Sequence, residues 1–206
     1  MNLLPFGKLP PAKPRSFVPV EIDLGDWPQI APLFDRLETR IAQVGSATEL
    51  ERWLLDWCEL SAALDEESSR RNIAMTCHTD NEDAEKAYLH FVEHVEPQLK
   101  PRQFALEQLY VAHPSRPALV QAGSRYQVFD RDVANHVQLF RPENVALETE
   151  EAKLCQQYQK LSGSLTVNFC GEEKTLVQMG RYLEEPDRAL RQEAWELVAK
   201  RRLLEV

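Results

Sequence analysis

The spacing of apolar residues predicts that most of the chain forms amphipathic helices. Between Asp26 and Gly45, apolar side chains recur three, four or seven residues apart, so they share one side of a helix that Asp26 starts and Gly45 ends. Ser46 and Glu49 follow with the spacing of a capping box, which predicts the start of a second helix. The apolar positions are Ile30, Leu33, Phe34, Leu37, Ile41 and Val44 in the first helix, and Leu50, Trp53, Leu54, Trp57, Leu60 and Leu64, with Ile73 as an extension, in the second.

The helical pattern continues beyond a polar turn at residues 78–81 and becomes weaker toward residue 140. Pro97 is expected to end the third helix, because a proline inside a helix removes a backbone hydrogen bond. Thr149 is expected to cap a later helix that carries Leu154, Tyr158 and Leu161. The third helix carries Ala84, Ala87, Tyr88, Phe91, Val92 and Val95 on one face, and shorter helices are expected near 101–112, 117–123 and 126–139.

After Gly163 the period of the pattern changes from helical to alternating. Leu165, Val167 and Phe169 alternate with polar residues, as in a strand that buries one face. Gly171 lies in the expected turn, and one β-hairpin is predicted near residues 165–176. The predicted fold class is therefore mainly α, a multi-helix bundle or array with one small β-hairpin.

Three regions are expected along the chain. Residues 1–20 contain five prolines and should form an extended arm. Residues 21–140 should form a helical subdomain, and residues 141–206 a helix, the hairpin and a last helix. That last helix is expected to begin at Asp187, to turn Ala194, Trp195 and Val198 inward, and to be still running at Val206, as in a chain truncated before a catalytic domain.

The charge of the chain argues against one class of partner. There are 24 Lys and Arg against 33 Asp and Glu, whereas a surface that binds nucleic acid needs a surplus of basic side chains. Residues 49–98 alone hold 13 acidic and 4 basic side chains. Nucleic acid is not expected as a partner. The acidic helices either face a binding site or form a solvated outer surface, and the outer surface is favoured.

The cysteines and the apolar runs indicate a cytoplasmic protein. Cys58, Cys77, Cys155 and Cys170 show no C-x-x-C spacing, so reduced and buried thiols are expected. No apolar run is long enough for a signal peptide or for a membrane span. No membrane partner is expected.

His90, Glu93 and His94 form an H-x-x-E-H string, which on a helix places two imidazoles one turn apart, as in inverted zincins. A helical projection puts both histidines well away from the apolar face and Glu93 nearly opposite to it. A catalytic zinc also needs a third ligand, and no second cluster of ligands stands out. Solvated side chains on an acidic helix are favoured over a zinc hydrolase centred on this string.

The remaining chemical patterns indicate structure rather than catalysis. Asp65, Glu66 and Glu67, followed by Arg70 and Arg71, have the spacing of ion pairs along a helix rather than of a paired acid and base. The tryptophans of the second helix are typical of a core. Phosphate-binding glycine loops and a recognisable nucleophile turn do not occur in the sequence. No catalytic, cofactor-binding or metal-binding residue is therefore assigned.

Longer stretches of the sequence resemble a known family. The segment from Trp57 to Pro97 resembles the amino-terminal region of oligoendopeptidase F-like zinc metallopeptidases, relatives of thimet oligopeptidase. Later blocks resemble the same family in the same order, so the resemblance covers roughly residues 20–206. These blocks are Leu139 to Val145, Tyr158 to Gly163, Gly171 to Leu176 and Asp187 to Arg191.

The resemblance implies a longer, largely helical peptidase whose two lobes enclose a channel for short peptides, with zinc held by an H-E-x-x-H helix and a downstream Glu. No H-E-x-x-H string occurs in residues 1–206, so this chain is expected to hold no cofactor and to be inactive alone. It would be the N-terminal lobe that walls one side of the channel, and its partners would be the missing catalytic lobe and short peptide substrates. The alternative is a stand-alone helical binding or scaffold module without peptidase activity.

Overall fold

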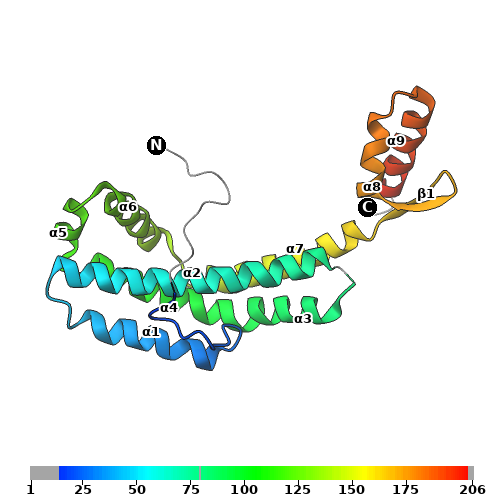
Figure 1. The fold of residues 1–206 in the computed structure, drawn as a ribbon. Coiled ribbons are helices and arrows are strands. Elements are labelled where there is room, and N and C mark those ends of the chain that lie inside the picture. The colour runs from blue at the N-terminus through cyan, green and yellow to red at the C-terminus, as the bar shows by residue number, and fades with distance from the viewer. Residues whose placement is uncertain (1–13, 79, 204–206) are drawn as a thin grey trace. The chain divides into compact units, whose positions relative to one another are not determined.

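A computed structural model describes residues 14–78 and 80–203. These residues are mainly helical, with one two-stranded antiparallel sheet, so the predicted fold class is confirmed (Figure 1). The chain divides into two compact units, Met1–Thr149 and Glu150–Val206, and each is described by itself. Most of the expected extended arm lies outside the described residues; residues 14–20 form bends and turns.

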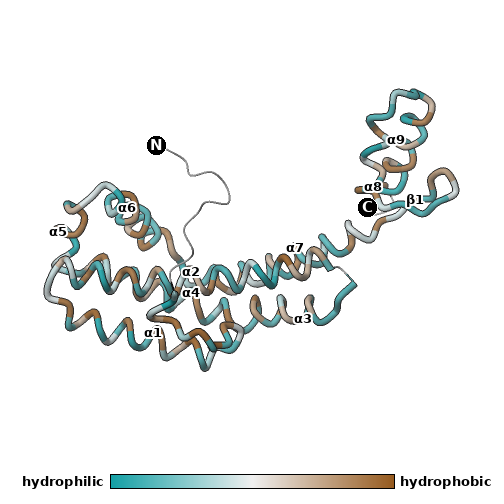
Figure 2. Tube along the Cα trace, viewed as in Figure 1, coloured by the Kyte–Doolittle hydropathy of each residue, from teal (hydrophilic) through white to brown (hydrophobic). Residues whose placement is uncertain are grey.

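The first two helices follow the predicted apolar stripes. Helix α1 spans Trp27–Ile41 and helix α2 spans Ala47–Cys77, and hydrophobic and hydrophilic positions alternate along both (Figure 2). Two details differ from the expectation: α1 ends at Ile41 instead of Gly45, and Ile73 is 58% exposed. The stripe residues that become buried are Ile30, Leu33, Phe34, Leu37 and Ile41 in α1 and Leu50, Trp53, Leu54, Trp57, Leu60 and Leu64 in α2.

The cap between these helices is a modified capping box. The Ser46 hydroxyl accepts the Glu49 backbone N–H at 3.3 Å, as predicted. The Glu49 carboxylate, however, accepts the backbone N–H of Gly45 at 2.8 Å. These bonds satisfy two donors at the connection between α1 and α2, which fixes where α2 begins.

Pro97 does not end the third helix, contrary to the prediction. Helix α3 (Glu82–His90) runs into a π-helical turn, η1 (Phe91–Val95), and then into α4 (Glu96–Val111). Pro97 lies in the first turn of α4, where a missing backbone N–H costs little. The π-helical turn η1 joins α3 to α4 just before this proline, so the chain stays helical through the junction.

Two shorter helices complete the first unit, close to where the sequence predicts them. They are α5 (Arg116–Gln121) and α6 (Ser124–Leu139). The core of this unit also includes one buried polar contact, in which the Trp53 indole N–H donates to the Leu37 carbonyl at 2.9 Å. The core residues outside α1 and α2 are Phe17, Val18, Leu24, Phe91, Val95, Leu99, Leu106, Tyr110, Leu119, Tyr126 and Val133.

Thr149 does not cap a helix, contrary to the prediction. Helix α7 spans Asn144–Gly163 and so begins five residues before Thr149. The Thr149 hydroxyl donates to the Val145 carbonyl at 3.0 Å, one turn back. A threonine that bonds the carbonyl of residue i−4 is tolerated inside a helix, and this bond replaces the expected capping role.

The second unit packs a hairpin against short helices. Strands β1 (Thr166–Phe169) and β2 (Glu172–Thr175) pair antiparallel, and Val167 and Phe169 point into the core as predicted. The turn contains Cys170 and Gly171, both with positive φ, which suits a tight hairpin turn. Helix α8 (Leu176–Met179) and the 3₁₀ turn η2 (Gly180–Glu184) follow.

The last helix, α9, spans Arg188–Leu203, and Asp187 caps it by accepting the Ala189 backbone N–H at 2.8 Å. Ala194 is buried as predicted, but Trp195 is 63% exposed, so its predicted inward position is wrong. Val198 packs beside the core as predicted, together with Leu190 and Leu197, and Trp195 lies about 100° around the helix from Ala194.

Candidate functional site

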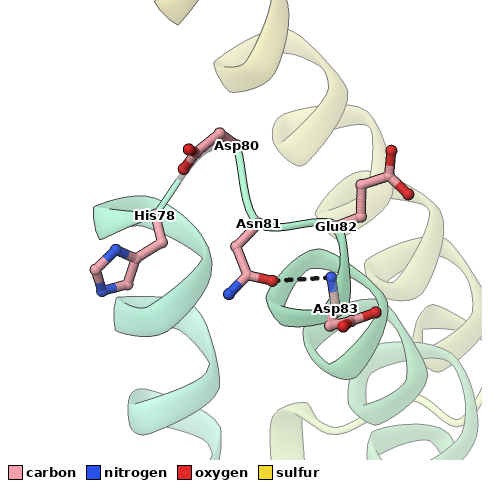
Figure 3. A pocket seen from close by; sticks show the side chains of 5 residues that line it. All are labelled: His78, Asp80, Asn81, Glu82 and Asp83. Atoms are coloured by element: carbon pink, nitrogen blue, oxygen red, sulfur yellow. Dashed lines mark hydrogen bonds between the residues drawn. The ribbon is translucent and has the colours of Figure 1, made fainter.

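A shallow depression lies at the turn between α2 and α3. It has a volume of about 570 Å³ and is lined by His78, Asp80, Asn81, Glu82 and Asp83. Figure 3 shows that the imidazole and the carboxylates point in different directions instead of toward one centre. The lining is acidic, but its functional groups do not converge as they do in a catalytic or metal site.

The amide side chain of the depression has a structural role. The Asn81 side-chain oxygen accepts the backbone N–H groups of Asp83 at 3.0 Å and Ala84 at 3.1 Å, which caps the N-terminus of α3 (Figure 3). Asp80, Glu82 and Asp83 are exposed, so water solvates their charge. The turn is therefore a helix start with an acidic surface.

The H-x-x-E-H string lies across the junction of α3 and η1. The rings of His90 and His94 have their centroids 4.9 Å apart, and both residues are exposed. Phe91 and Val95, which follow the two histidines in the sequence, are buried in the core of the first unit. Two imidazoles on a solvated surface fall short of the three protein ligands of a catalytic zinc site.

The other described residues were compared with the ligand sets of metal sites in the same way. Within residues 14–78 and 80–203, no group of three His, Cys, Asp or Glu side chains is placed to hold a metal ion. Cys58, Cys77, Cys155 and Cys170 are free, and all four are exposed, so the prediction that they are buried is wrong.

The acidic run in α2 forms ion pairs along the helix, as the spacing indicates. Glu66 bonds Arg70 at 2.6 Å, and Glu67 bonds Arg71 at 2.8 Å. The hydrogen bond and the charge of Arg70 hold the pKa of Glu66 below its usual range. A carboxylate that stays ionised beside a guanidinium does not serve as a general acid near neutral pH.

Two polar clusters that the sequence analysis did not anticipate tie distant segments together. The Glu59 carboxylate accepts the backbone N–H groups of Ser16, Phe17 and Val18, 41 to 43 residues earlier in the chain. Such bonds leave no local signal in the sequence, because backbone donors are common to nearly all residues.

The second cluster joins α4, α5 and α6 in the first unit. Arg116 donates to both carboxylate oxygens of Asp130, at 2.5 and 3.0 Å, and to the Val111 carbonyl at 3.0 Å. The Tyr110 hydroxyl donates to the same carboxylate at 3.1 Å. Burial, and then the charge of Asp130, raise the pKa of Tyr110 above its usual range, so this hydroxyl stays protonated. The cluster is a partly buried structural network.

The described residues form a mainly helical fold with one small hairpin. The sequence pattern of the Peptidase M3 N-terminal domain family matches residues 17–131, more than half of the chain, and the chain belongs to this family. The resemblance found in the sequence is thereby confirmed: the chain is an N-terminal region of an M3-family peptidase.

Comparison with solved structures agrees with this assignment. The chain is similar to a 3.1 Å X-ray structure named "putative Oligoendopeptidase F", with a TM-score of 0.80 and 26% sequence identity. The match covers 91% of this chain and 33% of that chain, so this chain spans about a third of the length of that protein. No protein with a curated description matches the sequence. No helix of the described residues is both long and apolar enough to cross a membrane.

Proposed function

We propose that this chain is the N-terminal lobe of a zinc-dependent oligopeptidase, a metalloendopeptidase that hydrolyses short peptides. In this proposal the lobe forms one wall of the substrate channel and is not catalytic by itself. The observation that carries the proposal is the similarity to one third of an oligoendopeptidase F-type structure, together with membership of the M3 N-terminal domain family.

The zinc of the proposed peptidase is assigned to residues outside this chain. The described residues do not fit a catalytic zinc site, because His90 and His94 supply two exposed imidazoles and no third ligand is near them. The contribution of this lobe would be steric. A wall that excludes folded proteins and orients a flexible peptide reduces the entropy lost when the peptide reaches the reacting centre.

The proposed partners are the catalytic lobe and short peptides, and the proposed location is the cytoplasm. The free cysteines support a reducing compartment. The net charge of −9 is unfavourable for binding nucleic acid.

The reading frame in the source genome tests the proposal. We expect the frame to continue past Val206 and to encode an H-E-x-x-H string followed by a further Glu. A stop codon directly after Val206 would contradict the proposal and would favour the stand-alone binding or scaffold module.

A further inference from the structure

The part of helix α7 in the second unit carries its large apolar side chains on its exposed side. Leu154 and Tyr158 are each 63% exposed, and Leu161 is 55% exposed. With about 100° between successive residues, these three side chains lie within about 60° of one another around the helix axis. We call this surface the α7 stripe.

The opposite side of the same helix is the covered one. Gln156 is buried, with 7% exposure, and Ala152 is half-buried. Both lie about 150 to 170° around the helix from the middle of the α7 stripe. A helix of a globular domain normally turns its apolar side inward. The segment 150–163 does the reverse, so three large apolar side chains stay in water while an amide and a methyl group are covered.

The surroundings of the stripe favour an apolar partner over a charged one. Glu150 and Lys153 form an ion pair on this helix. The exposed residues that flank the stripe are Glu151 on one side and the uncharged Gln157 on the other. An exposed apolar strip with a polar rim is typical of an interaction surface. The local charge has no single sign that would attract an acidic or a basic partner.

We propose that the α7 stripe is covered by the peptidase part of a longer polypeptide. This inference rests on the proposed function. The family pattern ends at residue 131, but the solved structure matches 91% of the chain, so the similarity extends well past that residue. Two thirds of that solved chain lie outside the match. A longer polypeptide of the same kind would therefore have further residues that could cover the stripe. Tyr158 would then be the central anchor of an interface between domains.

Hydroxyl-radical footprinting with peptide mass spectrometry tests the inference on unmodified protein. The two samples are the 206-residue chain and the protein encoded by the whole natural reading frame. We expect oxidation at Leu154, Tyr158 and Leu161 to be about fivefold slower in the whole-frame protein, because these side chains enter an interface core. Leu55 on α2, which is 58% exposed, is the internal reference for radical dose.

Three outcomes overturn the inference. The first is equal oxidation of the stripe in both samples. The second is slow oxidation already in dilute 206-residue chain, which means that the chain itself covers the stripe. The third is slow oxidation of the 206-residue chain only at high concentration, which means that a second copy covers it. If the whole-frame protein cleaves peptides in a zinc-dependent way while the stripe stays reactive, the proposed function stands and only this inference fails.

Discussion

The carboxylate of Glu59 in α2 accepts the backbone N–H of Phe17 at 2.7 Å, which holds the segment before α1 against α2. The same carboxylate accepts the backbone N–H of Val18 at 2.8 Å and that of Ser16 at 2.9 Å. Phe17 and Val18 are buried as a result, and the Arg36 guanidinium lies 4.5 Å from the centre of the Phe17 ring. One acidic side chain therefore organises an edge of the core.

Replacing Glu59 by Ala should destabilise the chain by about 1–3 kcal/mol, because the three backbone donors lose their acceptor in a partly buried place. Urea unfolding monitored by tryptophan fluorescence measures the change. Glu21→Ala is the matched control, since Glu21 is exposed, and it should change the free energy of unfolding by less than about 0.5 kcal/mol. Equal effects of the two substitutions would show that the Glu59 bonds do not hold the segment.

The same carboxylate predicts a pH dependence. Burial acts to raise the pKa of Glu59, but the hydrogen bonds from Val18, Ser16 and Phe17 outweigh it, so the pKa lies below its ordinary value of 4.5. A carboxyl group with a lowered pKa in the folded state adds stability above its unfolded pKa and loses it as the pH falls through the folded pKa. The stability difference between the natural chain and Glu59→Ala should therefore be constant above about pH 6 and should shrink below pH 4.5. A difference that grows on acidification would contradict this.

Asp130 should be the most sensitive carboxylate of α6. Replacing it by Ala leaves the partly buried Arg116 guanidinium and the Tyr110 hydroxyl without their shared acceptor, which should cost about 2–3 kcal/mol. Asp132→Ala, two residues along the same helix, is the matched control. Asp132 is 63% exposed and pairs with the similarly exposed Arg131, so the cost should stay below about 0.5 kcal/mol. Thermal unfolding of the two variants compares their losses of stability. A smaller loss for Asp130→Ala than for Asp132→Ala would refute the role of the network.

The acidic run of α2 should have little influence on substrate choice. In the whole-frame protein, the combined change Asp65→Asn, Glu66→Gln and Glu67→Gln should leave the ratio of kcat/KM for basic and acidic peptides within about twofold, because arginines of the same helix already balance Glu66 and Glu67. A loss of preference for basic peptides of about tenfold would place this run on the channel.

Local periodicity was sufficient to predict the helices that build the core. Ile30, Leu37, Leu50 and Leu60 are fully or almost fully buried because their spacing puts them on one side of α1 or α2. The errors arose where packing overrides a local rule. Pro97 continues a helix because a π-helical turn precedes it, and Trp195 is exposed although the helix around it packs on the hairpin.

Part of the side-chain chemistry followed from local spacing. The ion pairs of Glu66 with Arg70 and of Glu67 with Arg71 lie along α2 as predicted. The contacts of Glu59 and of Asp130 depend on segments that meet only in the folded chain, so no spacing rule could reveal them. The exposed side of α7 was also hidden, because Leu154, Tyr158 and Leu161 have the spacing of a buried stripe.

The central claim is that this chain is a lobe of a zinc peptidase and does not carry the chemistry itself. Cleavage of a short quenched-fluorescent peptide, measured with and without a zinc chelator, tests it most directly. We expect no cleavage by the 206-residue chain, and cleavage by the whole-frame protein that stops with the chelator and returns with added zinc. Chelator-sensitive cleavage by the 206-residue chain alone, or an inactive whole-frame protein, would contradict the account.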